Sequence, residues 1–242
     1  LRIGKKEFSL ASFFEDNQPI IYFNDSSTLE GNSYTEVSHL DPPYITEKLI
    51  TWDWSGVNIC KESQGVEKDP ETVQFRVIQE LKKGEYALIF DDDNSGEIAD
   101  VIAIKDNQGS IDIELYHCKF SGKKDPGGRI DDLYTVCGQA QKCTHWKEKA
   151  NTKPEDIFKR MIRREITKQE THQISRIELG CVDLIETMKV KSFNCPIQMK
   201  IFIVQPGLSK SEVSDDQLRL LAVTESYLMQ TYMLPFGVIC SP

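Results

Sequence analysis

The stretch that decides the fold is "YALIFDDDNSGEIADVIAIKDNQGSIDIELYHCKFS", residues 86–121. It contains three strand-like segments, "YALIF" at 86–90, "IADVIAI" at 98–104 and "SIDIELYHCKFS" at 110–121. Short polar turns that contain glycine separate these segments, as is usual between antiparallel neighbours. The stretch therefore predicts a three-stranded meander.

Helical patterns lie on both sides of this meander. Asp69 as N-cap and Pro70 at the first helical position predict a helix that ends at Gly84. After the meander, we expect one long helix over residues 130–149 and a second that begins near Pro154. The order of helix and strands indicates an α/β domain.

The C-terminal third adds two further strands and a helix. "MKIFIV" at 199–204 and "FGVIC" at 236–240 are predicted strands. Between them, residues 214–232 have the pattern of an amphipathic helix with Ser214 as its cap. Residues 170–195 show no clear pattern. The whole predicts a mixed β-sheet with helices on both faces.

The N-terminal residues differ in character and are predicted to form a small β-rich segment. Strand-like runs occur at 19–23 and 32–37, and "TWDWSGVNI" follows at 51–59. A polar linker at 61–69 precedes the helix. We therefore expect two domains, residues 1–65 and 66–242.

The composition is that of a globular protein, with 39% apolar and 28% charged residues. No stretch approaches the roughly 18–20 apolar residues of a membrane span, and we expect a cytoplasmic protein without membrane contact. Seven cysteines without a CxxC pair predict reduced, buried thiols. The chain begins with leucine, which is consistent with a fragment of a longer polypeptide.

The charge is unevenly distributed along the chain. The net charge of −9 argues against indiscriminate binding of nucleic acid. Between Lys142 and Lys168, however, nine Lys or Arg residues face four Asp or Glu residues. Such a cluster is by default a solvated helix face, but it also suits phosphate contact.

The chemically distinctive residues lie on the second and third strands of the meander. Asp100 is a carboxylate between apolar residues, where a charge is costly unless it has a partner. His117 and Lys119 share one face of the next strand because side chains alternate. Neighbouring strands are about 4.8 Å apart, so Asp100 is expected beside both residues. A carboxylate, a second ligand and a lysine suit metal-dependent phosphodiester hydrolysis.

The segments "GEIADVIAI", "ELYHCKFS" and "CGQAQK" resemble the motifs of the PD-(D/E)xK, or restriction-endonuclease-like, nuclease superfamily over about residues 70–145. The resemblance implies a restriction-endonuclease-like mixed sheet. It also implies that Asp100 and position 117 hold Mg²⁺ or Mn²⁺ and that Lys119 positions the attacking water. Gln139 or Gln141 would complete the site, and only one would face it because they lie about 200° apart on a helix.

Position 117 departs from the superfamily pattern, which has Asp or Glu there. Imidazole favours Mn²⁺ over Mg²⁺. Glu114 is a poor substitute, because its side chain points to the other face unless a bulge intervenes. Glu97 near the hairpin is a reserve metal ligand, and Glu80 or Gln74 on the preceding helix could add a further polar group.

The resemblance also implies DNA as substrate. More loosely, the whole chain is similar to the C-terminal portion of large bacterial helicase-like proteins, which implies a helicase or ATPase domain in the same parent chain. We expect basic residues to contact the phosphate backbone, namely Lys123, Lys124, Arg129, Lys142, Lys147, Arg160, Arg163 and Arg164. The predicted function is that of a metal-dependent DNA endonuclease.

Several alternatives stay open at this stage. The domain could be catalytically inactive and serve as a DNA- or protein-docking module, because His117 weakens the metal site. Asp100 and Lys119 could form a plain buried ion pair, and "DDDNSGE" at 91–97 a solvated turn or a calcium loop. A zinc site would need Cys118, Cys137, Cys143 and His145, which helical geometry disfavours. A nucleotide-binding α/β protein would need a glycine-rich strand–helix turn that the chain lacks.

Overall fold

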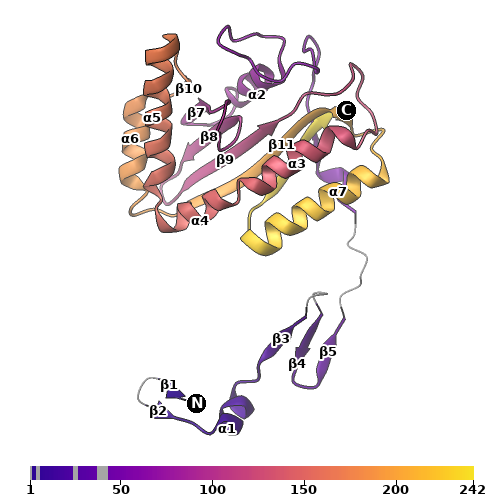
Figure 1. The fold of residues 1–242 in the computed structure, drawn as a ribbon, viewed down its shortest axis with the longest axis vertical. Coiled ribbons are helices and arrows are strands. Elements are labelled where there is room, and N and C mark those ends of the chain that lie inside the picture. Colours follow the sequence, from indigo (N-terminus) through magenta and orange to yellow (C-terminus); the bar gives the residue numbers. More distant parts are fainter. Residues whose placement is uncertain (1, 4–5, 24–26, 37–42) are drawn as a thin grey trace. The chain divides into compact units, whose positions relative to one another are not determined.

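The computed structural model describes residues 2–3, 6–23, 27–36 and 43–242, which fall into two units, Leu1–Pro42 and Pro43–Pro242 (Figure 1). The division therefore lies earlier than the predicted boundary after residue 65. Residues 43–65 belong to the large unit because strand β6 (Leu49–Thr51) pairs with its main sheet. The Tyr44 ring also packs edge-on against Phe236, with 6.1 Å between ring centroids.

The first unit is β-rich, as predicted. Its described elements are the two-stranded pair β1 (Arg2–Ile3) and β2 (Lys6–Glu7), helix α1 (Leu10–Asp16), and a three-stranded antiparallel sheet. That sheet contains β3 (Ile20–Tyr22), β4 (Thr28–Glu30) and β5 (Ser33–Thr35). Strand β4 lies between the two predicted strand-like runs, in a stretch for which no strand was predicted. The predicted strand end at Val37 lies outside the described residues.

The second unit is built on a seven-stranded mixed sheet in the order β10-β7-β8-β9-β11-β12-β6. Strands β7 (Leu88–Asp91), β8 (Val101–Asp106) and β9 (Ile111–Cys118) form the predicted antiparallel meander. Strands β11 (Ile197–Ser209), β12 (Phe236–Ser241) and β6 continue in parallel from β9. The sheet confirms the mixed α/β prediction.

Helices cover both faces of this sheet (Figure 1). On one face, α2 (Val73–Leu81) packs on a cluster that includes Val101 and Phe202. On the other face lie α3 (Asp131–Lys142), α4 (His145–Thr152) and α7 (Asp215–Ser226), with α5 (Glu155–His172) and α6 (Val182–Lys191) toward the β7–β10 edge. Strand β10 (Ile177–Leu179) and α6 occupy the region that gave no clear sequence pattern.

Two predicted helix boundaries differ from the structure, and a third is confirmed. The N-cap of α2 is Thr72, whose hydroxyl accepts from Phe75 N, and not Asp69. The predicted helix 130–149 is two helices, α3 and α4, which are separated by Cys143 and Thr144; the thiol and hydroxyl of these residues donate to backbone carbonyls of the preceding turn. Ser214 caps α7 with a full capping box, as expected.

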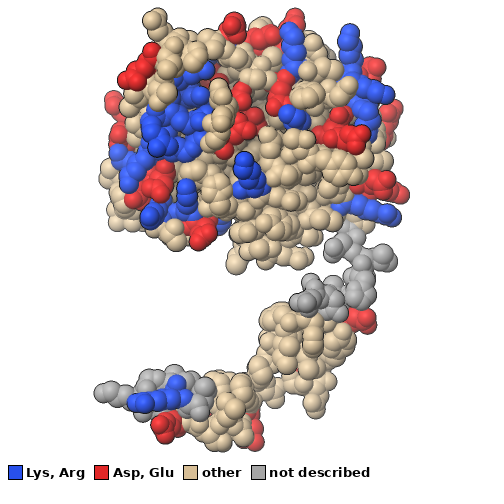
Figure 2. All heavy atoms as spheres, in the orientation of Figure 1, with Lys and Arg blue, Asp and Glu red and all other residues tan. Residues whose placement is uncertain are grey.

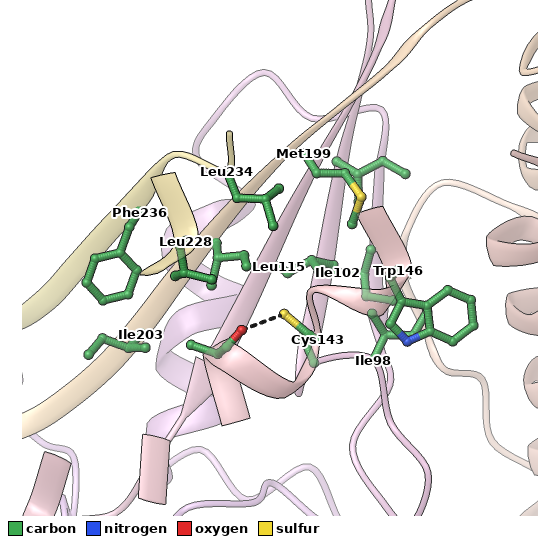
Figure 3. Packing of buried hydrophobic residues seen from close by; sticks show 14 of the residues in the cluster. Ile98, Ile102, Leu115, Cys143, Trp146, Met199, Ile203, Leu228, Leu234 and Phe236 are labelled. Carbon is green, nitrogen blue, oxygen red and sulfur yellow. Dashed lines mark hydrogen bonds between the residues drawn. The ribbon is translucent and has the colours of Figure 1, made fainter. Parts of the chain in front are cut away.

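The larger core lies between the sheet and α3, α4 and α7. In Figure 3, Ile102 and Leu115 of the sheet lie near Cys143, with Trp146 toward the right of the view and Leu228, Leu234 and Phe236 toward the left, and all of these residues belong to this one core. All seven cysteines are free thiols, and those at 118, 137, 143 and 240 are buried whereas Cys181 is exposed. Among the described residues, helices lack the length and apolar character that crossing a bilayer needs.

Candidate metal centre

Three carboxylates lie together in the loop that joins β7 to β8. Oxygen atoms of Asp93, Glu97 and Asp100 all lie within 4.8 Å of one another. Asp100 is 3% exposed and accepts a 2.8 Å hydrogen bond from the backbone N–H of Cys118 on β9. Asp93 and Glu97 are half-buried and open the group toward solvent. We call these three residues the acidic cluster.

The acidic cluster holds negative charge at an electrostatic cost. Burial raises the pKa of Asp100 well above its usual range, and the neighbouring charges of Glu97 and Asp93 raise it further. Burial also raises the pKa of Glu97. A cation among the three carboxylates would relieve both effects, and carboxylate oxygens are the donors that hard divalent ions prefer. The residues present therefore fit a divalent metal ion.

Lys119 reaches the same region through a partner that the sequence did not reveal. Its ammonium pairs with Glu62 Oε2 at 2.7 Å, and the same oxygen accepts a 3.0 Å hydrogen bond from Phe120 N. The charge of Glu62 contributes to the raised pKa of both Asp100 and Glu97. The ammonium of Lys119 is therefore held by Glu62, and the predicted position of Lys119 beside Asp100 stays a prediction.

A buried ion-pair network anchors the loop that carries Asp93 and Glu97. Asp92 has no exposed surface and accepts from Arg160 Nη1 at 2.7 and 2.8 Å, and Arg164 Nε lies 2.6 Å from Asp92 Oδ1. Asp92 also accepts from Ile98 N at 2.7 Å. Arg160 and Arg164 were predicted to contact DNA, but these contacts engage their guanidinium groups with the protein itself.

Arg176, which lies between α5 and β10, completes this network. Its Nη1 donates to the carbonyl oxygens of Asp91 at 2.9 Å and Asp93 at 3.0 Å. Arg164 Nη2 likewise donates to the Asp92 carbonyl at 2.8 Å. Donors that grip successive carbonyls fix the path of the loop, and so the positions of the carboxylates on either side. We call Arg160, Arg164 and Arg176 the arginine clamp.

Helix α2 contributes an amide to the site region, whereas Glu80 takes no part. Gln74 Nε2 donates to Asp91 Oδ1 at 2.9 Å, and Gln64 Nε2 donates to the other oxygen at 2.9 Å. Glu80 instead pairs with Lys83 at 2.7 Å and Arg76 at 3.6 Å. Glu80, which was expected as a possible further polar group of the metal site, is therefore not among the carboxylates of the acidic cluster, and Gln74 is the polar side chain that α2 directs to Asp91.

His117 faces a different environment from the one predicted. Its Nε2 lies 3.3 Å from Cys143 Sγ, and its buried Nδ1 has no hydrogen-bond partner among the described residues. Burial lowers the pKa of His117 to about 4, so the ring is neutral. His117 does not belong to the acidic cluster. It lines a small cavity of about 80 Å³ together with Glu97 and Gln139.

The two candidate glutamines separate as the helical geometry required. Gln139 lines the cavity beside His117 and Glu97, and its buried Oε1 has no partner among the described residues. Gln141 points toward α7 and donates from Nε2 to Thr224 Oγ1 at 3.4 Å. Gln139 is therefore the one of the pair that lies near the site.

The remaining basic residues differ in their availability. Arg129 is engaged by Asp132 and by the Ser121 hydroxyl, at 3.2 and 3.1 Å. Lys123, Lys124, Lys142 and Arg163 are exposed, and Lys147 is half-buried. Figure 2 shows Lys and Arg side chains gathered over α5, with acidic side chains beside them. A surface rich in Lys and Arg therefore borders one that carries Asp and Glu.

Sequence reasoning missed Asp93 and Glu62. Asp93 lies in "DDDNSGE", which was weighed as a solvated turn or calcium loop, and Glu62 lies in a stretch expected to be a linker. The density of carboxylates in "DDDNSGE" was the available signal. The zinc alternative gains no support, since the acidic cluster is the metal-compatible group found among the described residues.

No protein-family model, curated protein or solved structure matches this chain. The fold and the site together define a mixed α/β protein with a seven-stranded sheet and an acidic cluster able to bind a metal ion.

Proposed function

We propose that this chain is a metal-dependent nuclease domain of the restriction-endonuclease-like type that hydrolyses phosphodiester bonds in DNA. The observation that carries the proposal is the acidic cluster, together with a Lys119–Glu62 pair whose carboxylate charge acts on Asp100 and Glu97. The order of elements supports it: helix α2, strand β7, Asp100 before β8, Lys119 after β9, then Gln139 on α3. Carboxylates and a lysine at the ends of adjacent strands suit this chemistry.

The chain's own residues have distinct roles in this proposal. Asp93, Glu97 and Asp100 would hold Mg²⁺ or Mn²⁺ in place of the predicted Asp100–His117 pair. When bound, such an ion polarises a phosphate and lowers the pKa of a coordinated water. Lys119 would orient that water and offset charge on the phosphate, and in the structure its ammonium pairs with Glu62.

The basic surface over α5 is the proposed contact with the DNA backbone (Figure 2). The exposed Lys and Arg side chains would attract the backbone phosphates and so bring phosphate oxygens near the metal ligands. The acidic side chains beside them would limit the positions that the phosphates can take. A helicase or ATPase domain in a parent chain, which would move DNA past this site, stays part of the proposal.

A second candidate is a catalytically inactive module that docks on DNA or protein. The observation that favours it is His117, which stands where an acidic ligand is expected and contacts Cys143 instead of the acidic cluster. In that case the carboxylates would maintain the loop without supporting catalysis.

Plasmid and linear DNA incubated with Mg²⁺ or Mn²⁺ test the proposal. Asp100→Ala and Lys119→Ala should each abolish cleavage, and Asp100→Ala should also weaken Mn²⁺ binding measured by calorimetry. Glu80→Gln is the matched control, because its carboxylate lies outside the cluster. Unchanged cleavage in both alanine variants would end the catalytic assignment. Tight DNA binding without cutting under either metal would favour the docking module.

A further inference from the structure

A concave site lined by none of the acidic cluster's residues lies against the β7–β8 loop. Its volume is about 570 Å³, and its walls are residues 94–96 of the loop and the C-terminal half of α5. Four arginines and one lysine line it, and no carboxylate does among the residues that the structure describes; the five cations are Arg160, Arg163, Arg164, Lys168 and Arg176. We call it the basic pocket.

The cations of the basic pocket are only partly neutralised. Asp92 pairs with Arg160 and Arg164. The side chains of Arg163 and Lys168 form no ion pair with any residue in the described part of the chain. A site with this excess of positive charge has the electrostatics of an anion-binding site.

Arg176 adds an independent observation. Its side chain is 7% exposed, yet its Nε has no hydrogen-bond partner among the described residues. Its guanidinium donates to the backbone carbonyls of Asp91 and Asp93 and has no carboxylate partner among the described residues, so its positive charge adds to that of the pocket wall.

Crowding of like charges supports the same conclusion. The pKa of Arg164 is lowered first by burial, and the positive charges of Arg176 and Arg160 lower it further although Asp92 acts in the opposite direction. An anion in the pocket would offset this repulsion. Arginine forks match phosphate oxygens in geometry as well as in charge.

We propose that the basic pocket binds a phosphomonoester of nucleotide size. A phosphomonoester carries close to two negative charges at neutral pH, which suits several cations better than the single charge of a phosphodiester does. The pocket has the volume of a small-molecule site and so accepts a sugar and base as well as the phosphate.

The position of the pocket connects it to the acidic cluster. Residues Asn94, Ser95 and Gly96 line the pocket, and they are flanked in the chain by Asp93 and Glu97 of the cluster. A phosphorylated DNA end held in the pocket would therefore lie beside the proposed cleavage centre. Binding of a phosphorylated DNA end rests on the proposed nuclease function, whereas binding of a free nucleotide does not.

Binding measurements in EDTA separate the pocket from the metal centre. The probes are inorganic phosphate, adenosine 5′-monophosphate, and one short DNA strand with either a 5′-phosphate or a 5′-hydroxyl. We expect the phosphorylated probes to bind, with Arg163→Ala and Lys168→Ala each weakening them roughly tenfold. Lys83→Ala removes the same charge at the end of α2 and should have no effect. Thermal denaturation confirms that each variant is folded.

The outcomes distinguish both the source of the ligand and the two proposals. A strong preference for the 5′-phosphorylated strand over the hydroxyl strand identifies a DNA end, and equal affinity of the mononucleotide identifies a free nucleotide. Failure of every phosphomonoester to bind, equal binding of the hydroxyl strand, or unchanged binding in both variants would overturn the pocket. Nucleotide binding without DNA cleavage would refute the nuclease alone, and cleavage without nucleotide binding would refute the pocket alone.

Discussion

Replacement of Asp92 tests whether the arginine clamp is a structural device. Asp92→Asn keeps the size of the side chain and one acceptor oxygen, so the hydrogen bond from Ile98 N can persist. It removes the charge that neutralises Arg160 and Arg164, whose guanidinium groups then lie buried without a counter-ion. Asp92 itself has no exposed surface, so water cannot take over these contacts.

The expected loss follows from this burial. Breaking a buried ion pair by removal of one partner costs about 3–5 kcal/mol in unfolding free energy. For a unit of this size each kcal/mol lowers the melting temperature by about 2–4 °C, so we expect a fall of roughly 6–20 °C. The carboxylate group at position 92 thus contributes a large share of a typical folding free energy.

Urea unfolding followed by circular dichroism measures the effect. Asp125→Asn is the control, because Asp125 is exposed and its change should stay within about 0.5 kcal/mol. Arg160→Met should cost less than Asp92→Asn, since Arg164 still pairs with the carboxylate. A loss for Asp92→Asn below about 1 kcal/mol, or equal to the control, would refute the structural role of the arginine clamp. Arg160 and Arg164 would then again be candidates for contact with DNA.

Three further changes test other parts of the molecule. Burial lowers the pKa of His117 from 6.5 to about 4. The neutral ring therefore contributes stability that is fully present above pH 6.5 and is lost as the pH falls through 4. The total loss in unfolding free energy is about 3 kcal/mol. Melting temperatures across this range should show the loss in the wild type, and His117→Gln should remove that part of it; an unchanged profile would contradict the buried neutral ring. Gly237→Ala should destabilise the unit by about 1–3 kcal/mol in urea, since a Cβ there would lie 2.6 Å from the Phe202 ring, which stacks on Tyr116; wild-type stability would show that Phe202 moves freely. Ser214→Ala should cost about 1 kcal/mol through loss of the capping box of α7, whereas Ser214→Asp should retain most of it, and equal losses in both would argue against capping.

Features encoded by short-range patterns were predictable from the sequence. The meander of β7, β8 and β9 follows from three apolar runs and two polar turns, and Ser214 indicates the start of α7 because it is a favourable N-cap residue. Asp100 was recognisable because a carboxylate inside an apolar strand needs a partner, and Lys119 lies in the same strand-end region. Such signals depend on residues only a few positions apart.

The tertiary structure decided which residues join the site and which support it. Glu62 meets Lys119 only because residues 43–65 pack on the large sheet. Asp93 joins Asp100 only because the arginine clamp, on α5 and just before β10, fixes the loop. His117 contacts Cys143, the residue that follows the last residue of α3. These pairings join segments far apart in the chain, and their geometry depends on sheet register and helix packing, which periodicity and turn chemistry do not specify.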